Sequence, residues 1–160
     1  AIKIALDFGV KKGTITKTIP KIKFEGRLNY LKTGKLRKYL HKKENLFIDG
    51  CHSITSAKNL NNYLKTIKEP IYGIWGMQKN KMPKQFIKVF EKTFKKLITV
   101  TIPNEPNAIS AIKLKSYSYT KKTISAKNIY KALKFISNKQ TKTIVVFGSL
   151  YFVGDVLSKN

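Results

Sequence analysis

Apolar residues recur along the chain with two periods, one typical of buried strands and one typical of amphipathic helices. Short apolar runs of strand length occur at 46–49, 71–75, 97–102 and 143–147. Between them, apolar residues recur every three or four positions, as in a helix with one buried face; Ala57, Leu60 and Leu64 are an example. Strands that alternate with helices predict a mostly parallel sheet with helices on both faces. We therefore expect an α/β, three-layer, Rossmann-like domain over residues 26–160.

The expected helices begin at residues that suit a first turn. A serine hydroxyl just before a helix accepts a backbone N–H from that turn. Three serines have this position: Ser53, Ser125 and Ser149. Pro83 suits a first helical position, where its missing N–H does no harm. The helix from Pro83 is expected to present a stripe of Phe86, Phe90, Phe94 and Leu97. A short helix is expected at 108–114, whereas 116–120 fits a strand or a loop.

The amino-terminal part has weaker signals. Residues 1–24 suggest a helix end, a lysine-rich turn and a second helix, which suits a linker or the tail of a preceding domain. Residues 26–31 suggest an extended strand. The polar stretch 32–44 suggests a hairpin that turns at Gly34, with Arg37 exposed to solvent.

The net charge of +25 raises the question of nucleic-acid binding. All but two of the 33 basic residues are lysine, although arginine is the usual residue for reading base edges and forked phosphate contacts. The lysines are spread over every segment. We therefore expect a solvated lysine surface and no specific nucleic-acid partner, with nonspecific binding of polyanions at low salt.

Several classes of site are absent from the sequence. One cysteine and two histidines exclude an internal disulfide and leave little for a metal site, so no metal ligand is assigned. No Gly-x-x-x-x-Gly-Lys-Ser/Thr loop follows a strand, and no catalytic triad is evident. No apolar run approaches the roughly 18 residues of a membrane span. We expect a cytoplasmic, monomeric protein without membrane contact.

Two turns after strands carry the candidate chemistry, because ligands of open α/β sheets bind beyond the carboxyl ends of the strands. Asp49 ends the first long strand and is followed by His52. The acid could hold a ribose hydroxyl, a metal or an ammonium group, or it could only stabilise the turn before Gly50. His52 could hydrogen-bond a nucleotide or a carboxylate, or be an ordinary surface histidine. Ser149 could bind a substrate carboxylate or only cap the last helix.

Arg27 stands out because the chain uses lysine almost everywhere else. A retained arginine suggests a forked, planar contact with phosphate.

Four segments together resemble the folylpolyglutamate synthase/dihydrofolate synthase family of the Mur ligase superfamily. Residues 26–28 (Gly-Arg-Leu) resemble the family's Pro-Gly-Arg-Leu/Phe, and 49–53 (Asp-Gly-Cys-His-Ser) resemble Asp-Gly-Ala-His-Asn. Residues 76–82 (Gly-Met-Gln-Lys-Asn-Lys-Met) resemble Gly-Met-x-x-Asp-Lys-Asp. Residues 146–156 (Val-Phe-Gly-Ser-Leu-Tyr-Phe-Val-Gly-Asp-Val) resemble the terminal Gly-Ser-Leu/Phe-Tyr/His-x-Val-Gly-Glu-Val motif. Four motifs in the right order are more specific than any one of them.

The resemblance implies a reaction and a division of the chain. Family enzymes use ATP and magnesium to convert a pteroate or folate carboxylate to an acyl phosphate, which the amino group of glutamate then displaces. A P-loop ATPase domain precedes their α/β carboxyl-terminal domain. Residues 1–25 would be the tail of such a domain plus the linker, and 26–160 the glutamate-ligase domain. The ATPase domain, in cis or in trans, would hold most ligands of ATP and magnesium.

The resemblance also implies residue roles. Arg27 would reach the nucleotide phosphates, Asp49 and His52 would contact the nucleotide, and His52 and Ser149 would lie near glutamate. No residue is assigned as catalytic with certainty. We expect the isolated chain to fold without ligating dihydropteroate or folate to glutamate.

The sequence departs from the family pattern at four positions. Asn80 and Met82 replace two acids, while Ser53 and Ile54 replace Asn and Pro. A degenerate, non-catalytic module that binds a nucleotide or a partner therefore remains an alternative. A third alternative is a polyanion binder, whose affinity would fall steeply with salt.

Overall fold

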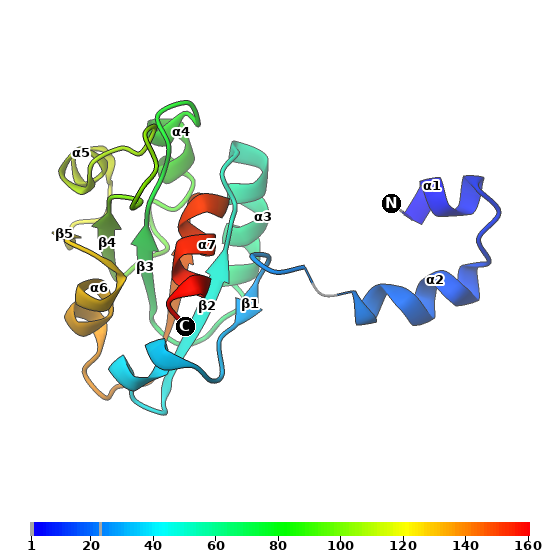
Figure 1. The fold of residues 1–160 in the computed structure, drawn as a ribbon, viewed down its shortest axis with the longest axis horizontal. Helices are drawn as coiled ribbons and strands as arrows, with labels where there is room; N and C mark the ends of the chain where they lie inside the picture. The colour runs from blue at the N-terminus through cyan, green and yellow to red at the C-terminus, as the bar shows by residue number, and fades with distance from the viewer. Residues whose placement is uncertain (1, 23) are drawn as a thin grey trace.

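The computed structural model describes residues 2–22 and 24–160, whose main part is an α/β domain (Figure 1). The strands are β1 (Asn29–Tyr30), β2 (Glu44–Asp49), β3 (Ile71–Trp75), β4 (Lys96–Val100), β5 (Thr123–Ala126) and β6 (Lys142–Phe147). The α-helices are α1 (Ile2–Asp7), α2 (Lys12–Thr18), α3 (Ile54–Leu64), α4 (Pro83–Lys88), α5 (Ala111–Tyr117), α6 (Ile129–Ile136) and α7 (Leu150–Ser158). Two 3-10 helices are η1 (Ile19–Lys21) and η2 (Lys35–Tyr39).

The strands form one sheet in the order β1-β2-β6-β3-β4-β5. Strand β6 comes last in the chain but lies between β2 and β3, and it pairs in parallel with both. Strands β3, β4 and β5 are also parallel, and only β1 is antiparallel to its neighbour. The prediction of a mostly parallel sheet is confirmed.

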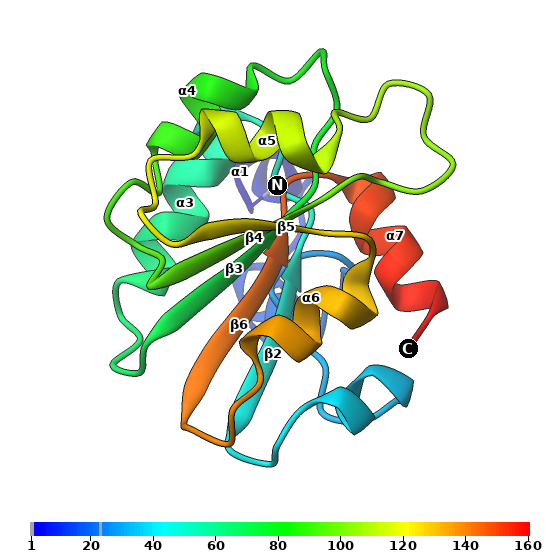
Figure 2. The ribbon, with the colours of Figure 1, turned by 90° about the vertical axis from the view of Figure 1, so that its left-hand side faces the viewer.

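Two apolar layers enclose this sheet. One layer combines α6 and α7 with residues such as Ile48, Ile74 and Val146. The other combines α3, α4 and α5 with the opposite face, including Trp75 and Phe147. Figure 2 shows the sheet between these two groups of helices. The three-layer arrangement follows from strands that are apolar on both faces.

The periodic helices agree with the sequence. In α3, Ala57, Leu60 and Leu64 are buried as expected, and in α6 the buried residues follow the same spacing. Ser53 caps α3 and Ser149 caps α7, each by accepting a backbone N–H from the first turn. These helices are specified by local pattern and by capping chemistry.

Three helix predictions differ from the structure in detail. Ser125 does not cap a helix but lies inside β5, a strand that the sequence did not indicate; Asn128 caps α6 instead. The helix from Pro83 ends at Lys88, so Phe90 and Phe94 are buried from the segment between α4 and β4. An apolar stripe can be buried equally well by a helix or by a packed loop, so spacing alone did not fix the end of α4. The expected helix at 108–114 is α5, shifted to Ala111–Tyr117.

The segment before β2 also differs from the prediction. There is no hairpin at Gly34: η2 follows it, and of residues 26–31 only 29 and 30 are in a strand. Arg37 is not free in solvent, because its guanidinium donates to the carbonyl oxygens of Glu44 (2.6 Å) and His41 (3.3 Å). Tertiary contact with the start of β2 decided this segment.

The amino-terminal helices form a pair set apart from the sheet (Figure 1). Residues of α1 and the following turn expose large apolar side chains, with Phe8 84% and Ile4 60% exposed. A hollow of about 240 Å³ between α1, α2 and η1 is lined by Ile2, Ala5, Val10, Thr14, Ile15, Thr18, Ile19 and Ile22. The pair therefore has an apolar surface that the α/β domain does not cover.

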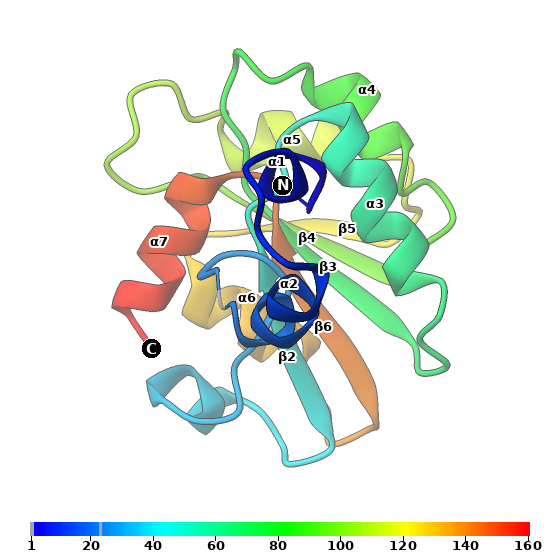
Figure 3. The ribbon, with the colours of Figure 1, turned by 90° about the vertical axis from the view of Figure 1, so that its right-hand side faces the viewer.

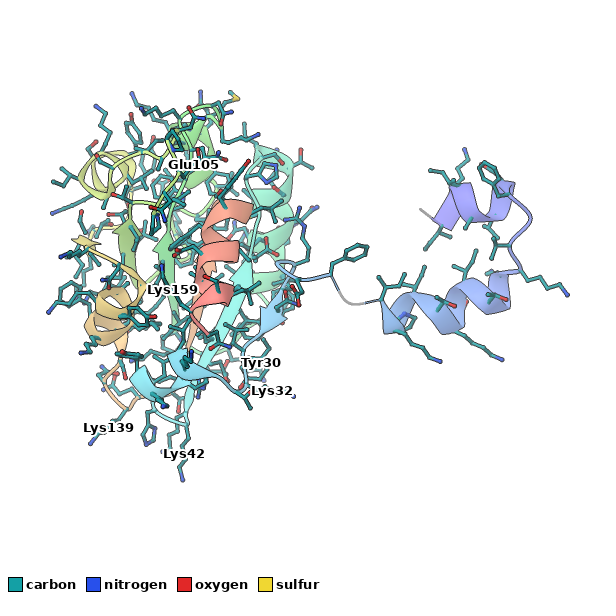
Figure 4. All side chains as sticks on the ribbon, in the orientation of Figure 1. Tyr30, Lys32, Lys42, Glu105, Lys139 and Lys159 are labelled. Carbon is teal, nitrogen blue, oxygen red and sulfur yellow. The ribbon has the colours of Figure 1, made fainter. Side chains whose placement is uncertain are left out.

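A buried ion pair joins the amino ends of β2 and β6. Glu44 and Lys142 are 0% and 1% exposed, and Lys142 Nζ lies 3.2 Å from Glu44 Oε1. Glu44 also accepts hydrogen bonds from the Ser137 hydroxyl and from the backbone N–H groups of Asn138 and His41. In Figure 4, Lys42 and Lys139 mark this end of the molecule and Glu105 the opposite end. The pair ties the loop before β6 to the start of β2.

Glu44→Gln is expected to lower the free energy of unfolding by about 3–5 kcal/mol, because Lys142 would keep its buried charge without a counter-charge. Urea denaturation of the purified chain measures this. Glu91→Gln, which changes an exposed carboxylate, is the matched control and should stay within about 0.5 kcal/mol of the parent. Equal stabilities of the two variants would show that the pair does not hold the sheet.

The same pair predicts a pH dependence. Burial raises the pKa of Glu44, but the hydrogen bonds from Ser137, His41, Asn138 and Lys142 outweigh it and leave the pKa below its ordinary value of 4.5. The stability that the Glu44 carboxylate contributes is therefore present above pH 4.5. It is lost as the pH falls through the lowered pKa of Glu44 in the folded chain. The stability gap between the parent and Glu44→Gln should narrow in that acidic range. A gap that does not change with pH would contradict the assignment.

Candidate functional site

Three strands end side by side at one edge of the sheet. Asp49 of β2 and Trp75 of β3 both pair with Phe147 of β6, so the last residues of the three strands lie in one row. The turns that follow, at Gly50, Gly76 and Gly148, are therefore neighbours. The Asp49 turn and the Ser149 turn, each predicted to follow a strand, therefore lie at the same edge of the sheet.

Asp49 fixes two backbone segments with its two oxygens. Oδ1 accepts the N–H of Cys51 (2.8 Å), and Oδ2 accepts the N–H of Leu28 (3.0 Å), 21 residues earlier. The side chain is 7% exposed. The carboxylate thus holds its own turn, as the structural interpretation of the sequence expected, and also binds the segment that carries Arg27.

Arg27 lies over the turn after β2. Its loop is fixed on both sides, because Leu28 N–H reaches Asp49 and Gly50 N–H donates to the Gly26 carbonyl (2.7 Å). A Cβ added to Gly50 would be 3.2 Å from Arg27 Nη1, so the guanidinium lies directly against Gly50. Arg27 is exposed to solvent. The only arginine near this edge is therefore available to an anion.

Cys51 and His52 are neighbours in sequence but have different surroundings. Cys51 is 1% exposed and belongs to the core under α3. Burial, with the Asp49 carboxylate beside it, raises the pKa of the Cys51 thiol, although the Gly148 amide and Arg27 act in the opposite sense. The thiol remains protonated and inert at neutral pH.

His52 is half-buried, and its Nδ1 lies 3.0 Å from the Gly50 carbonyl. A carbonyl can only accept, so Nδ1 carries a hydrogen. Neutral His52 then presents Nε2 as an acceptor, and protonated His52 presents it as a donor. The ring is thus oriented by its own turn.

Ser149 begins α7 next to this turn. It is 1% exposed, and its Oγ accepts the N–H of Tyr151 (3.2 Å). Gly148 before it has φ +112°, a conformation that side-chain-bearing residues rarely adopt. Ser53 begins α3 at the neighbouring turn, with a reciprocal capping arrangement with Ser56. Figure 3 shows α3 and α7 starting at the same edge of the sheet.

This arrangement favours anions. The amino ends of α3 and α7 both point to the edge, where backbone N–H groups and helix dipoles attract negative charge. Arg27 adds a full positive charge that suits phosphate or carboxylate. Asp49 has both oxygens in backbone hydrogen bonds, so the negative charge at the edge is already partly compensated.

The part of the chain that the structure describes has neither a group of metal ligands nor a membrane-spanning helix. Across residues 2–22 and 24–160, no three His, Cys, Asp or Glu side chains are grouped as metal ligands. Within the same residues, no helix has the length and apolar character needed to span a membrane.

The chain matches one known protein family over most of its length. Residues 32–159 match the family model described as dihydrofolate synthetase, C-terminal domain. The chain belongs to this family. Curated protein sequences gave no match.

Solved structures share the fold of this dihydrofolate synthetase C-terminal domain. Folylpolyglutamate synthase of Mycobacterium tuberculosis, complexed with ADP and AMPPCP, matches with a TM-score of 0.79 at 16% identity over 97% of this chain. E. coli FolC in complex with DHPP and ADP matches with a TM-score of 0.74 at 16% identity over 93%. Folylpolyglutamate synthase of Thermotoga maritima matches with a TM-score of 0.72 at 20% identity over 92%. The chain spans 37%, 34% and 33% of these proteins, or about a third of their length.

The structure thus brings Arg27, Asp49, His52 and Ser149 to one edge, while their ligand contacts remain predictions. Sequence reasoning missed Trp75, whose indole lies under the Gly148 turn. Its signal was available, because it is the only tryptophan in the chain and ends a strand at this edge.

Gly148→Ala is expected to destabilise the domain by about 2 kcal/mol or more, because of its φ and because the new methyl group would lie 2.5 Å from the Gly76 carbonyl oxygen and from Trp75 Cδ1. Thermal and urea unfolding measure this. Gly154→Ala, inside α7 with open space around it, is the control and should stabilise by about 0.5–1 kcal/mol. A neutral Gly148→Ala would show that the turn tolerates other conformations.

Proposed function

We propose that this chain is the carboxyl-terminal domain of an ATP-dependent ligase that joins glutamate to a pteroate or folate carboxylate. The observation that carries this proposal is the anion-favouring edge, where Arg27 and the amino ends of α3 and α7 meet in a chain of the dihydrofolate synthetase family. Structures of similar fold are described as complexed with ADP, which supports a nucleotide at family level.

Each of the four site residues would have its own binding role. Arg27 would hold nucleotide phosphate with its forked donors. Asp49 would orient the Arg27 loop and contact the nucleotide at its edge. Ser149, with the start of α7, would hold a carboxylate of glutamate. His52, whose Nδ1 is held by the Gly50 carbonyl, would accept a hydrogen bond at Nε2 from the nucleotide or from the glutamate amino group.

ATP and magnesium would be bound mainly by another domain. ATP supplies the activation of the carboxylate that glutamate then attacks, and the described residues of this chain hold no cluster of metal ligands. The chain spans about a third of the structures it resembles. This supports an ATPase domain in cis or in trans as the partner.

Residues 1–25 would be the tail of such a domain plus the linker. Support comes from the apolar hollow between α1, α2 and η1, which the α/β domain leaves uncovered. The preceding domain would cover this hollow.

The first test is phosphate release. The chain alone, with ATP, magnesium, glutamate and dihydropteroate, should release no phosphate above buffer. The same chain joined to a family ATPase domain should release phosphate only when all substrates are present. Turnover by the isolated chain would overturn the division of labour, and no turnover by the joined protein would overturn the ligase proposal.

Arg27→Lys in the joined protein should lower kcat/KM about ten- to a hundredfold, because a charged, forked hydrogen bond is worth roughly 1.5–3 kcal/mol. The loss should appear in the KM for ATP. Arg37→Lys is the matched control, since Arg37 contacts the start of β2 at the other end of the strand. If the two variants have equal activity, Arg27 does not bind the nucleotide.

The second candidate is a non-catalytic module that binds a nucleotide or a partner. One observation in the segment after β3 favours this candidate. Met82 stands where the family pattern has an acid. Its side chain is 55% exposed at the start of α4 and does not cap that helix. Binding of ADP by a joined protein that shows no turnover would favour this candidate.

A further inference from the structure

The indole nitrogen of Trp75 has no hydrogen-bond partner. Within residues 2–22 and 24–160 it is the one buried side-chain nitrogen or oxygen atom of this kind, and the residue is 0% exposed. A buried donor without an acceptor loses the hydrogen bonds that it makes with water. Phenylalanine would fill much of the same space without this cost, so the unpaired group needs an explanation.

Trp75 lies directly under the turn that begins α7. Its ring stacks on Phe86 on the core side, with centroids 6.3 Å apart and planes at 16°. The place of a Gly148 Cβ is 2.5 Å from Trp75 Cδ1 and 2.8 Å from Trp75 Nε1. Glycine at 148 therefore allows the backbone to lie against the indole N–H.

An acceptor lies close to the same point. The Gly76 carbonyl oxygen is 2.5 Å from that Cβ position, and Gly76 N–H also donates to the Phe147 carbonyl (3.2 Å). The turns after β3 and β6 are thus tied together around the indole. The Gly148 backbone therefore lies beside both the indole N–H and the Gly76 carbonyl.

We propose that Trp75 is a positioning residue for the Gly148–Ser149 turn, and that its N–H pairs with the Gly76 carbonyl when a carboxylate binds at Ser149. The buried indole N–H gains a partner in the bound arrangement, and this gain favours that arrangement. The indole supports the turn from the core and never touches the ligand. This inference rests on the proposed function, because it takes Ser149 to bind a carboxylate of glutamate.

The test uses the one tryptophan of the chain, which gives a single indole signal in a ¹⁵N–¹H spectrum of the full chain. L-glutamate is added at constant ionic strength, kept with sodium chloride, because the chain carries a net charge of +25. The indole proton should move downfield and exchange more slowly with solvent. Both changes should saturate together with the shift of the Ser149 amide.

Trp75→Phe removes the N–H and keeps an aromatic ring on Phe86. It should weaken glutamate binding, measured at the Ser149 amide, by at least about fivefold. Tyr72→Phe is the matched control, because it removes a polar group from an aromatic ring on the same strand near its other end, and it should bind as the parent does. The parent titration decides the question if Trp75→Phe does not fold.

The outcomes separate this inference from the proposed function. A Ser149 shift with an unchanged indole signal, and unchanged binding by Trp75→Phe, overturns the role of Trp75 and leaves the glutamate site standing. No shift at either place overturns the glutamate site and the role of Trp75 together.

Discussion

The register of β6 between β2 and β3 is the constraint on which the rest of the structure depends. Parallel pairing aligns Asp49, Trp75 and Phe147, so the turns that follow these three strands begin at the same edge of the sheet. Each turn begins with glycine, which lets helix and strand ends approach closely; a Cβ at Gly76 would lie 2.9 Å from Phe152 of α7. Without this alignment, residues from distant parts of the chain would not form one edge.

Asp49 shows how a single side chain can serve the fold and the site together. Its two backbone hydrogen bonds hold the turn after β2 and the loop that carries Arg27, and those segments are far apart in sequence. The position of Arg27 is therefore set by the domain and not by the linker before it. A domain boundary near residue 25 is consistent with this arrangement, because the contacts that hold Arg27 at the sheet edge do not involve α1 or α2.

Charge is distributed differently at the two ends of the sheet. At the amino ends of the strands, Glu44 and Lys142 are buried together and fully hydrogen-bonded, which stabilises the fold and offers nothing to a ligand. At the carboxyl ends, the arginine is exposed and the helix starts face outward. Most lysines are exposed, among them Lys32, Lys42 and Lys139 (Figure 4). Under the proposed function, specificity at the edge would come from Arg27 and backbone groups rather than from net charge.

The sequence by itself determined the sheet type, the cores of α3 and α6, the caps of α3 and α7 and the common edge for Asp49 and Ser149. These features depend on local periodicity and on the rule that parallel strands end together. Only the tertiary structure decided β5, the end of α4, the 3-10 helix in place of a hairpin and the contacts of Arg37. Each of these depends on partners distant in the chain: Ser125 lies in a strand because β4 pairs with it, and Arg37 is held because β2 starts beside it. The sequence marks Trp75 as a lone tryptophan at the end of a strand, but its unpaired donor is visible only when all its neighbours are in place.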